Sequence, residues 1–230
     1  MKFILLFCLL LLSVFTPVQA EEKNVSPGIN QHYQDAKYQQ WLSTFEWSGR
    51  EVYDRRVDVL QKLGLKTGMD IADIGAGTGF YSLLFAQQVS KSGTVFAVDV
   101  TDDFVANIKR RAAQNKLHNI QDILSEQKDT RLLPASIDMA FVCNTYHHFE
   151  YPQAMLTSIH RALRPGGTLV IIDYRKQPGT SSSWVMSHVR HDKQSVIDEI
   201  EQGGFKFQSE SDMLKENYFL RFLKAESTKD

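Results

Sequence analysis

The feature that most constrains the fold is a glycine-rich turn between an apolar stretch and a helical pattern. The residues run Ala72-Asp73-Ile74-Gly75-Ala76-Gly77-Thr78-Gly79-Phe80. Three glycines at alternating positions allow the backbone to turn sharply and to approach a ligand, which a Cβ atom would prevent. The helix that follows offers unpaired N–H groups and the positive end of its dipole. The sequence therefore predicts a strand–turn–helix unit that binds a ligand.

The spacing of the glycines limits the kind of ligand. Nicotinamide dinucleotides are usually held by G-x-G-x-x-G, whereas the glycines here follow G-x-G-x-G. The carboxylate of Asp73, two residues ahead of the first glycine, would repel a pyrophosphate but suits an ammonium group. Asp99 lies 22 residues beyond Gly77 at the end of a predicted strand, where an acidic side chain binds ribose hydroxyls in either cofactor class. These residues favour a positively charged nucleoside over the alternative, a nicotinamide cofactor of an oxidoreductase.

Strand and helix patterns alternate along most of the chain. Strands are expected at residues 69–74, 94–100, 120–124, 137–144, 167–173, 205–207 and 218–223, and helices at 79–89, 104–117, 152–163 and 195–202. This alternation predicts an α/β fold: a Rossmann-like, doubly wound, mostly parallel seven-stranded sheet with an antiparallel edge strand. Residues 35–63 predict an N-terminal helical extension that breaks at Ser48-Gly49.

The first twenty residues are typical of a cleavable secretory signal peptide. Lys2 precedes an apolar run of 13 residues, and small residues precede a cleavage site after Ala20. At about 1.5 Å per residue the run is shorter than a hydrocarbon core of about 30 Å. We therefore expect an exported protein, periplasmic or secreted, with no stable membrane insertion after cleavage; an uncleaved membrane anchor is the alternative.

The predicted domain organisation is simple. Residues 1–20 form the signal peptide, residues 21–34 a loose polar tail, and residues 35–230 one domain whose sheet-containing core spans 69–225. The net charge of −1 gives no sign of a nucleic-acid partner. Cleavage leaves Cys143 as the only cysteine, and its apolar neighbours predict a buried, unreactive thiol.

The stretch after the fourth predicted strand contains Asn144, Tyr146, His147 and His148. Ligands of doubly wound sheets lie beyond the carboxyl ends of the strands, so substrate contact or proton transfer is one interpretation of these side chains, and a structural role is the other. No metal site is expected, because adjacent residues on one element usually point apart and no cysteine or acidic partner stands at ligand spacing.

Together these motifs resemble the class I S-adenosylmethionine-dependent methyltransferases. The resemblance rests on the glycine-rich turn, on Asp99, and on Leu163-Arg-Pro-Gly-Gly167 before the fifth strand, and it extends from about Tyr38 to Phe222. Further stretches resemble a bacterial subgroup of that family, namely Phe45-Glu46, Arg50-Glu-Val-Tyr53, Tyr146-His-His-Phe149, His188-Val-Arg190 and Asn217-Tyr-Phe-Leu-Arg221.

The resemblance implies S-adenosyl-L-methionine as the cofactor. The cofactor-binding residues that it implies are Asp73, Gly75, Ala76, Gly77, Gly79, Asp99, Glu126 and Asn144. The turn would hold the methionine end and Asp99 the ribose. Glu126 and Asp129 compete for the adenine amino group. Asn144 stands beside the sulfonium, where close relatives are expected to carry aspartate.

The function implied by the resemblance is methyl transfer to an acceptor. A small molecule is expected, because nothing basic or repetitive suggests a polymer. The reaction requires alignment and the exclusion of water. If the accepting atom carries a proton, the candidate catalytic residues are His147, His148 and Tyr146. His188, Arg190 and His191 form a basic cluster in an expected loop, either solvated or against an acidic ligand group. The export signal leaves open a non-catalytic, nucleoside-binding protein of the same fold.

Overall fold

The seven strands form one sheet in the computed structural model, which describes residues 22–33 and 35–226; the predicted signal peptide at 1–20 lies outside these residues. The strands are β1 (Ile71–Ile74), β2 (Val95–Asp99), β3 (Ile120–Leu124), β4 (Ile137–Cys143), β5 (Leu163–Tyr174), β6 (Phe205–Ser211) and β7 (Asn217–Lys224). Their order across the sheet is β3-β2-β1-β4-β5-β7-β6. The winding direction therefore reverses between β1 and β4.

Most neighbouring strands are parallel. Parallel pairing joins β3, β2, β1, β4 and β5, whereas β7 pairs antiparallel with both β5 and β6. The predicted α/β fold with a mostly parallel, seven-stranded sheet is confirmed. The antiparallel strand β7 lies one position inside the edge, which β6 forms. All four residues of β1 are buried, as expected for a central parallel strand that is covered on both faces.

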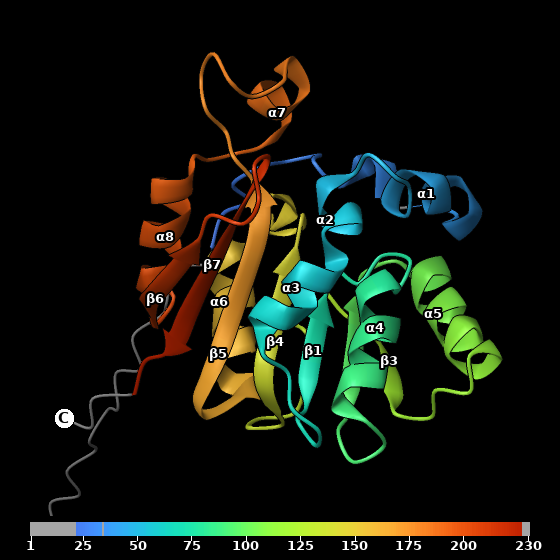
Figure 1. The fold of residues 1–230 in the computed structure, drawn as a ribbon. Helices are drawn as coiled ribbons and strands as arrows, with labels where there is room; N and C mark the ends of the chain where they lie inside the picture. Colours follow the sequence, from blue (N-terminus) through green and yellow to red (C-terminus); the bar gives the residue numbers. More distant parts are fainter. Residues whose placement is uncertain (1–21, 34, 227–230) are drawn as a thin grey trace, which may run out of the picture.

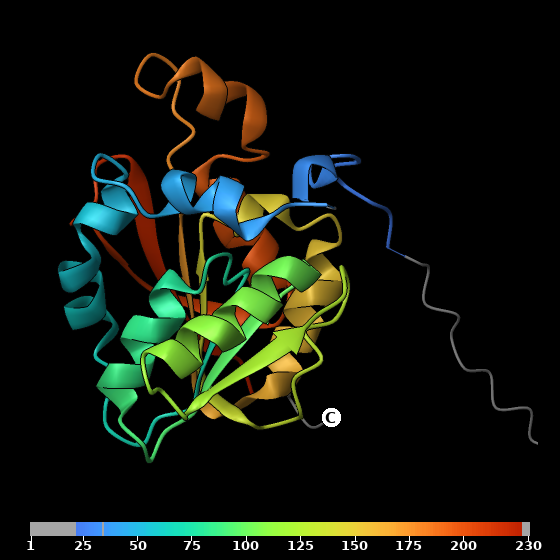
Figure 2. The same cartoon turned by 90° about the vertical axis from the view of Figure 1, so that its right-hand side faces the viewer.

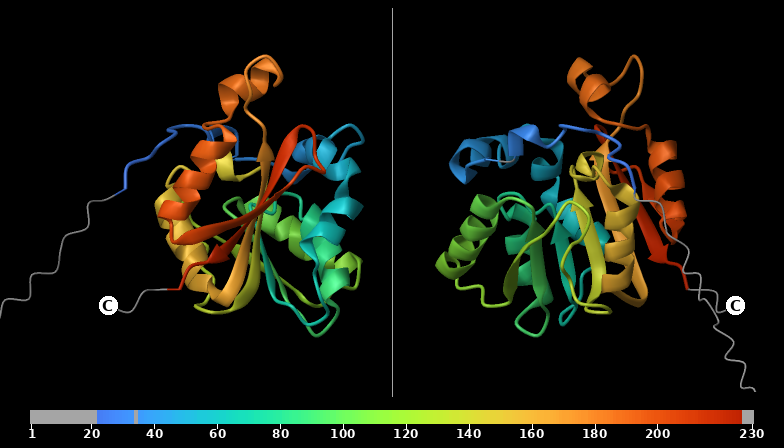
Figure 3. Two further views of the ribbon diagram at one scale, coloured as in Figure 1. Left: turned by 60° about the vertical axis from the view of Figure 1, so that its left-hand side comes forward. Right: turned by 180° about the vertical axis from the view of Figure 1, so that it is seen from behind.

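Helices cover both faces of the sheet. The helices are α1 (Tyr38–Phe45), α2 (Glu51–Asp54), α3 (Arg56–Leu63), α4 (Phe80–Val89), α5 (Asp102–Gln114), α6 (Pro152–Ala162), α7 (Ser183–His188) and α8 (Lys193–Gln202), with 3-10 turns η1 (Gln31–Tyr33) and η2 (Tyr146–His148). Figures 1 and 3 show α3, α4 and α5 on one face and α6 and α8 on the other, each layer packed on its own cluster of buried side chains. Within the described ranges, no helix has the length and apolar character needed to cross a membrane.

The N-terminal extension is three short helices rather than the one or two pieces that the sequence suggests. Gly49, between α1 and α2, has a φ of +112°, which favours glycine. Arg55 separates α2 from α3, and α3 ends at Gly64 in the left-handed conformation. The breaks let α1 lie over one end of the sheet while α3 buries Val59 and Leu63 against its face.

Helices α1 and α7 lie beyond the carboxyl ends of the parallel strands (Figure 2). The sequence predicts α1 but not α7, because the serine-rich stretch after β5 resembles a loop. The Ser182 side chain accepts a hydrogen bond of 3.2 Å from the Val185 backbone N–H and so caps the first turn of α7. The last residue of this helix is His188.

The polar segment at residues 22–33 packs against the domain and is not the loose tail that the sequence predicts. Tyr151, the N-cap residue of α6, makes no side-chain capping bond, so the first N–H groups of this helix need other acceptors. The Glu22 carboxylate supplies them, at 2.9 Å from the backbone nitrogen of Gln153 and 2.7 Å from that of Ala154. A negative charge at a helix N-terminus is stabilising, which explains why this segment docks.

Candidate active site

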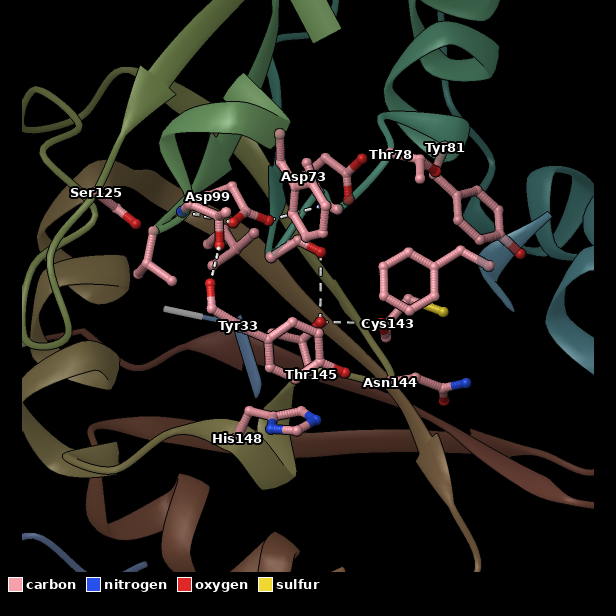
Figure 4. Close-up of a pocket in the computed structure, with 18 of the residues that line it drawn as sticks. Tyr33, Asp73, Thr78, Tyr81, Asp99, Ser125, Cys143, Asn144, Thr145 and His148 are labelled. Atoms are coloured by element: carbon pink, nitrogen blue, oxygen red, sulfur yellow. Dashed lines mark hydrogen bonds between the residues drawn. The ribbon is translucent and has the colours of Figure 1, made fainter. Parts of the chain in front are cut away.

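A pocket opens at the carboxyl ends of β1, β2 and β4, where the strand order reverses. Ligands of doubly wound sheets bind at this position. The empty volume is about 1010 Å³ including the open mouth, which is large enough for a nucleoside-sized ligand. Figure 4 shows Asp73 and Asp99 on one side of the pocket, with Thr145 and His148, from the segment after β4, on the opposite side.

The glycine-rich turn forms one wall of the pocket. A Cβ atom on Gly75, where φ is +71°, would lie 2.2 Å from the Thr145 side chain. A Cβ atom on Gly77, where φ is +56°, would lie 3.1 Å from the Phe45 ring. Gly79 does not line the pocket: it is the N-cap of α4, and its missing Cβ leaves room for a side chain of α5. The turn residues that line the pocket are Gly75, Ala76 and Gly77.

Asp99 ends β2 and is buried against the turn. Its two carboxylate oxygens accept backbone N–H bonds of 2.8 Å from Gly77 and 2.9 Å from Thr101. Burial raises the pKa of Asp99, and these hydrogen bonds oppose the rise. Each oxygen has a further acceptor position. The side chain lines the pocket and can therefore accept two more hydrogen bonds from neighbouring hydroxyl groups.

Asp73 is 4% exposed and lies in β1, just before the turn. Its Oδ2 accepts a hydrogen bond of 2.6 Å from the Ser82 hydroxyl in α4. Burial raises the pKa of Asp73 to about 7, and the charge of Asp99 adds to this while Ser82 opposes it. No basic side chain of residues 22–33 or 35–226 forms an ion pair with Asp73. A ligand with an ammonium group would favour its ionised form.

Asn144 follows β4 with a φ of +50° and lines the pocket. Its Oδ1 and Nδ2 atoms are buried, and neither has a hydrogen-bond partner among the described residues. Unpaired buried polar atoms are costly, so this amide fits a ligand-binding position. The adjacent Cys143 also lines the pocket, and burial raises the pKa of its thiol to about 12. The thiol therefore stays protonated at neutral pH.

The two carboxylates considered for the adenine amino group do not line the pocket. The Glu126 side chain is 60% exposed and pairs with Arg131. Asp129 forms a separate ion pair on the surface of the domain. Ser125 and Gln127 line the pocket instead. The loop after β3 thus offers a hydroxyl and an amide to the pocket where the sequence predicts a carboxylate.

The three candidate catalytic residues lie in η2 but have different surroundings. The buried Tyr146 hydroxyl donates a hydrogen bond of 2.7 Å to Glu199, and burial raises the pKa of Tyr146 well above its ordinary value. Nδ1 of His147, which is 4% exposed, lies 2.8 Å from Asp173. Of the three, His148 alone lines the cofactor-sized pocket. Burial, followed by the two nearby histidines, lowers the pKa of His148 to about 2, too low for an effective general base.

The rings of His147 and His148 do not point apart as the sequence predicts, since their centroids are 4.2 Å apart. Helix α7 brings His188 against both rings, at centroid distances of 5.2 and 5.1 Å. The basic cluster expected around His188 is divided. Arg190 pairs with a glutamate of α8 at 2.9 Å, whereas His191 is exposed. The structure thus groups His188 with the histidines of η2 at the edge of the pocket.

Several further pocket residues were not predicted as site residues, among them Arg50, Phe45 and Tyr33. Arg50 is the one lysine or arginine among the described lining residues, and it donates a hydrogen bond of 2.8 Å to the Phe45 carbonyl. Both belong to stretches of the family resemblance, which could have identified them. Tyr33 comes from the segment expected to be loose, so no sequence signal pointed to it.

Comparison with known proteins identifies the family. A family model for a methyltransferase domain matches residues 65–221. A ubiquinone/menaquinone biosynthesis C-methyltransferase of Blochmanniella floridana is 32% identical over 123 residues, 50% of this chain and 46% of that protein. An arsenite methyltransferase of Halobacterium salinarum is 28% identical over 106 residues, 46% of this chain and 27% of that protein. The chain therefore spans less than half the length of these curated relatives.

Solved structures share the fold. A SAM-dependent methyltransferase from Aquifex aeolicus has a TM-score of 0.74 at 24% identity, over 83% of this chain and 100% of that one. A phosphoethanolamine N-methyltransferase 2 of Haemonchus contortus, in complex with S-adenosyl-L-methionine, has a TM-score of 0.65 at 16% identity, over 83% of this chain and 60% of that one. With the family model matching residues 65–221, the chain belongs to the methyltransferase domain family, and S-adenosyl-L-methionine is its cofactor.

Proposed function

We propose that the protein transfers a methyl group from S-adenosyl-L-methionine to a small-molecule acceptor in the pocket beyond β1, β2 and β4. The observation that carries the proposal is a pair of buried carboxylates, Asp73 and Asp99, on either side of the glycine-rich turn. The cofactor has an ammonium group, a sulfonium and a ribose but no phosphate, so its chemistry complements these residues. The unpartnered amide of Asn144 offers further polar atoms that a bound ligand can satisfy.

The methionine end of the cofactor is assigned to the turn after β1. Asp73 accepts hydrogen bonds from the ammonium group, which favours the charged carboxylate and offsets the cost of its burial. Arg50, on the same pocket, supplies a guanidinium for the cofactor carboxylate. Gly75 and Gly77 leave the backbone of the turn open to the ligand, and a Cβ at either position would also crowd Thr145 or Phe45.

The nucleoside end is assigned to the loops after β2 and β3. Asp99 holds the ribose hydroxyls with the acceptor positions that Gly77 and Thr101 leave free. Ser125 and Gln127 take the place of the carboxylate expected for the adenine amino group. Each offers an oxygen that can accept a hydrogen bond from an amine.

S-adenosyl-L-methionine supplies a methyl group on a positively charged sulfur, which is a good leaving group. The protein then has to align the acceptor and exclude water. Tyr33 and Phe45 give the pocket an aromatic cover: the Tyr33 ring stacks on Trp41 at 4.6 Å and meets the edge of His148 at 5.1 Å. The apolar cover supports transfer in a water-poor site without a general base.

A small-molecule acceptor is supported by the proteins that this chain resembles. Their names include a quinone-biosynthesis C-methyltransferase, an arsenite methyltransferase and a phosphoethanolamine N-methyltransferase. These acceptors differ in the atom that takes the methyl group, so the proposal leaves that atom open. The net charge of −1 shows no overall basic excess of the kind typical of nucleic-acid-binding domains. The alternative of a non-catalytic nucleoside-binding protein finds no support among the relatives.

We also propose that residues 1–20 direct export and are removed after Ala20. The composition of these residues supports the proposal. Mass spectrometry of the protein recovered from periplasm or medium should identify Glu21 as its first residue. An intact chain starting at Met1 in the membrane fraction would instead support the uncleaved anchor.

Calorimetric titration of the purified protein with S-adenosyl-L-methionine, and separately with NAD⁺, tests the assigned site. We expect the first to bind and the second not to bind. Asp99→Ala should abolish binding, whereas Asp212→Ala removes a carboxylate that is 94% exposed and serves as the matched control. Release of S-adenosylhomocysteine in the presence of candidate acceptors then reports transfer. A wild-type protein that binds no S-adenosyl-L-methionine would overturn the proposal.

A further inference from the structure

Three imidazole rings meet at the edge of the cofactor pocket. His147 and His148 come from η2, and His188 comes from the end of α7, about forty residues later. Each ring offers a nitrogen, and the three nitrogens all lie within 4.8 Å of one another. No local pattern in the sequence brings these side chains together, because α7 lies in a stretch that resembles a loop.

Two of these rings have nitrogen atoms without partners. Nε2 of His147 and Nδ1 of His148 are buried, and neither forms a hydrogen bond in the part of the chain that is described. Buried polar atoms are normally satisfied by protein or by a bound species. Two unpaired ring nitrogens in one cluster therefore point to a ligand shared between them.

Asp173 orients the first of these histidines. Its carboxylate oxygens lie 2.8 and 3.0 Å from Nδ1 of His147, and one of them also accepts the His147 backbone N–H at 3.0 Å. Nδ1 therefore carries the proton, and Nε2 presents its lone pair to the cluster. A carboxylate that holds the remote nitrogen of a ligating histidine in this way is a common outer shell of metal sites.

Aromatic side chains pack around the three histidines and hold His188 in place. The Trp184 ring stacks on His188 at 4.6 Å with an interplanar angle of 21°, and the Tyr174 ring meets the edge of His147 at 5.9 Å. Within these aromatic surroundings, Nε2 of His147 and Nδ1 of His148 remain without hydrogen-bond partners among the described residues. His148 also lines the cofactor pocket, so one side of the cluster opens towards that pocket.

We propose that His147, His148 and His188 bind a divalent transition-metal ion, with zinc as the best fit. Imidazole nitrogens suit zinc and its neighbours in the first transition row, whereas magnesium and calcium prefer oxygen ligands. Zinc–nitrogen bonds of about 2.0–2.1 Å place tetrahedral ligands roughly 3.3 Å apart. The nitrogens lie within 4.8 Å of one another, so binding requires the rings to move closer together.

Because His148 also lines the pocket, a fourth ligand would be a water molecule or an electron-pair donor of the methyl acceptor. Three protein ligands with one open position are typical of zinc sites that handle a substrate. The identity of this fourth ligand rests on the proposed function, whereas metal binding by the three histidines does not.

The test uses the purified protein without a polyhistidine tag, stripped of metal with a chelator and titrated with Zn²⁺. Co²⁺ is titrated in parallel, because its visible absorption reports tetrahedral coordination. We expect one ion per chain, a tetrahedral Co²⁺ spectrum and a higher melting temperature with Zn²⁺. His188→Phe keeps an aromatic ring beside Trp184 but has no ligand nitrogen. This variant should bind Zn²⁺ more than about 100-fold more weakly, because loss of an outer-shell partner alone costs 10–100-fold.

His191→Phe is the matched control, since it removes an exposed histidine three residues away and should retain the wild-type affinity. Calorimetry with S-adenosyl-L-methionine verifies that both variants are folded, and it separates this proposal from the cofactor assignment. The metal site would be overturned if the wild type bound no Zn²⁺, or if His188→Phe bound it as tightly as the control while all three proteins bound the cofactor.

Discussion

Replacing Asp73 by asparagine should stabilise the ligand-free protein at neutral and alkaline pH, although it removes a cofactor contact. The Asp73 side chain is 4% exposed, and burial raises its pKa to about 7, compared with about 3.9 in an unfolded chain. At pH values between these two pKa values, Asp73 holds a proton in the folded state that it has lost in the unfolded state. The stability due to this proton is fully present below about pH 4 and is lost as the pH rises through about 7.

The magnitude follows from the linkage between protons and folding. One proton held by the folded state alone changes the free energy of unfolding by about 1.4 kcal/mol per pH unit. Across the roughly three pH units between the two pKa values, the loss reaches on the order of 4 kcal/mol. Asparagine keeps the shape of the side chain and its oxygen can still accept the Ser82 hydrogen bond, but it has no charge to bury. Asp99 is present in both proteins, so the difference between them reports Asp73 together with its interaction with Asp99.

Urea unfolding of both proteins without cofactor measures the effect. From about pH 5 to pH 7 the wild type should lose roughly 2–3 kcal/mol relative to Asp73→Asn, with little further change above pH 8. Saturating S-adenosyl-L-methionine should stabilise the wild type at neutral pH and leave the variant almost unaffected. A difference in stability that did not change with pH would refute the inference that buried Asp73 is protonated in the ligand-free protein.

Three further substitutions test contacts elsewhere. Gly75→Ala should abolish cofactor binding measured by calorimetry, because its Cβ would lie 2.2 Å from a neighbouring side chain; Gly179→Ala, also at positive φ but with nothing within 4 Å, is the control. Glu51→Ala should lower the free energy of unfolding, measured in urea, by about 2 kcal/mol. The Glu51 carboxylate accepts the backbone N–H groups of residues 215–217, which lead into β7 and include its first residue. Glu22→Gln should lower the free energy of unfolding by about 1 kcal/mol in the same assay, because it removes a negative charge at the N-terminus of α6. An unchanged unfolding midpoint for either glutamate variant would contradict the role assigned to that residue.

Most of the sheet was predictable because its signals are local. Residues 120–124 were expected as a strand and form β3 with the same bounds. Strand β5 begins at Leu163, four residues before the predicted start, because the chain continues in the sheet through a register shift at the Pro-Gly-Gly stretch. Alternating hydrophobicity does not reveal such an irregularity. Helix α7 was missed for a similar reason, since a side-chain cap and not an apolar period marks its start.

The site was predictable where its residues lie at strand ends. Asp73 and Asp99 were found because parallel strands bring their carboxyl ends to one edge of the sheet. Tyr33 was not found and His188 was expected only in a basic loop cluster, because both reach the pocket region from segments without a periodic signal. Their positions depend on long-range packing: the aromatic contacts of Tyr33 with Trp41 and of His188 with both η2 histidines.

The stretches that resemble a bacterial subgroup of the family divide into two kinds once their contacts are known. Glu51 and Asn217 bind each other, and Arg221 donates hydrogen bonds of 3.0 and 3.1 Å to the last carbonyl groups of α3. These contacts hold the helical extension against β7, although Oδ1 of Asn217 is buried without a hydrogen-bond partner among the described residues. The histidines of η2 are different, because their buried nitrogens lack partners. Packing accounts for most of the first kind and leaves the second unexplained, so any chemistry particular to this protein is best sought at the histidine cluster.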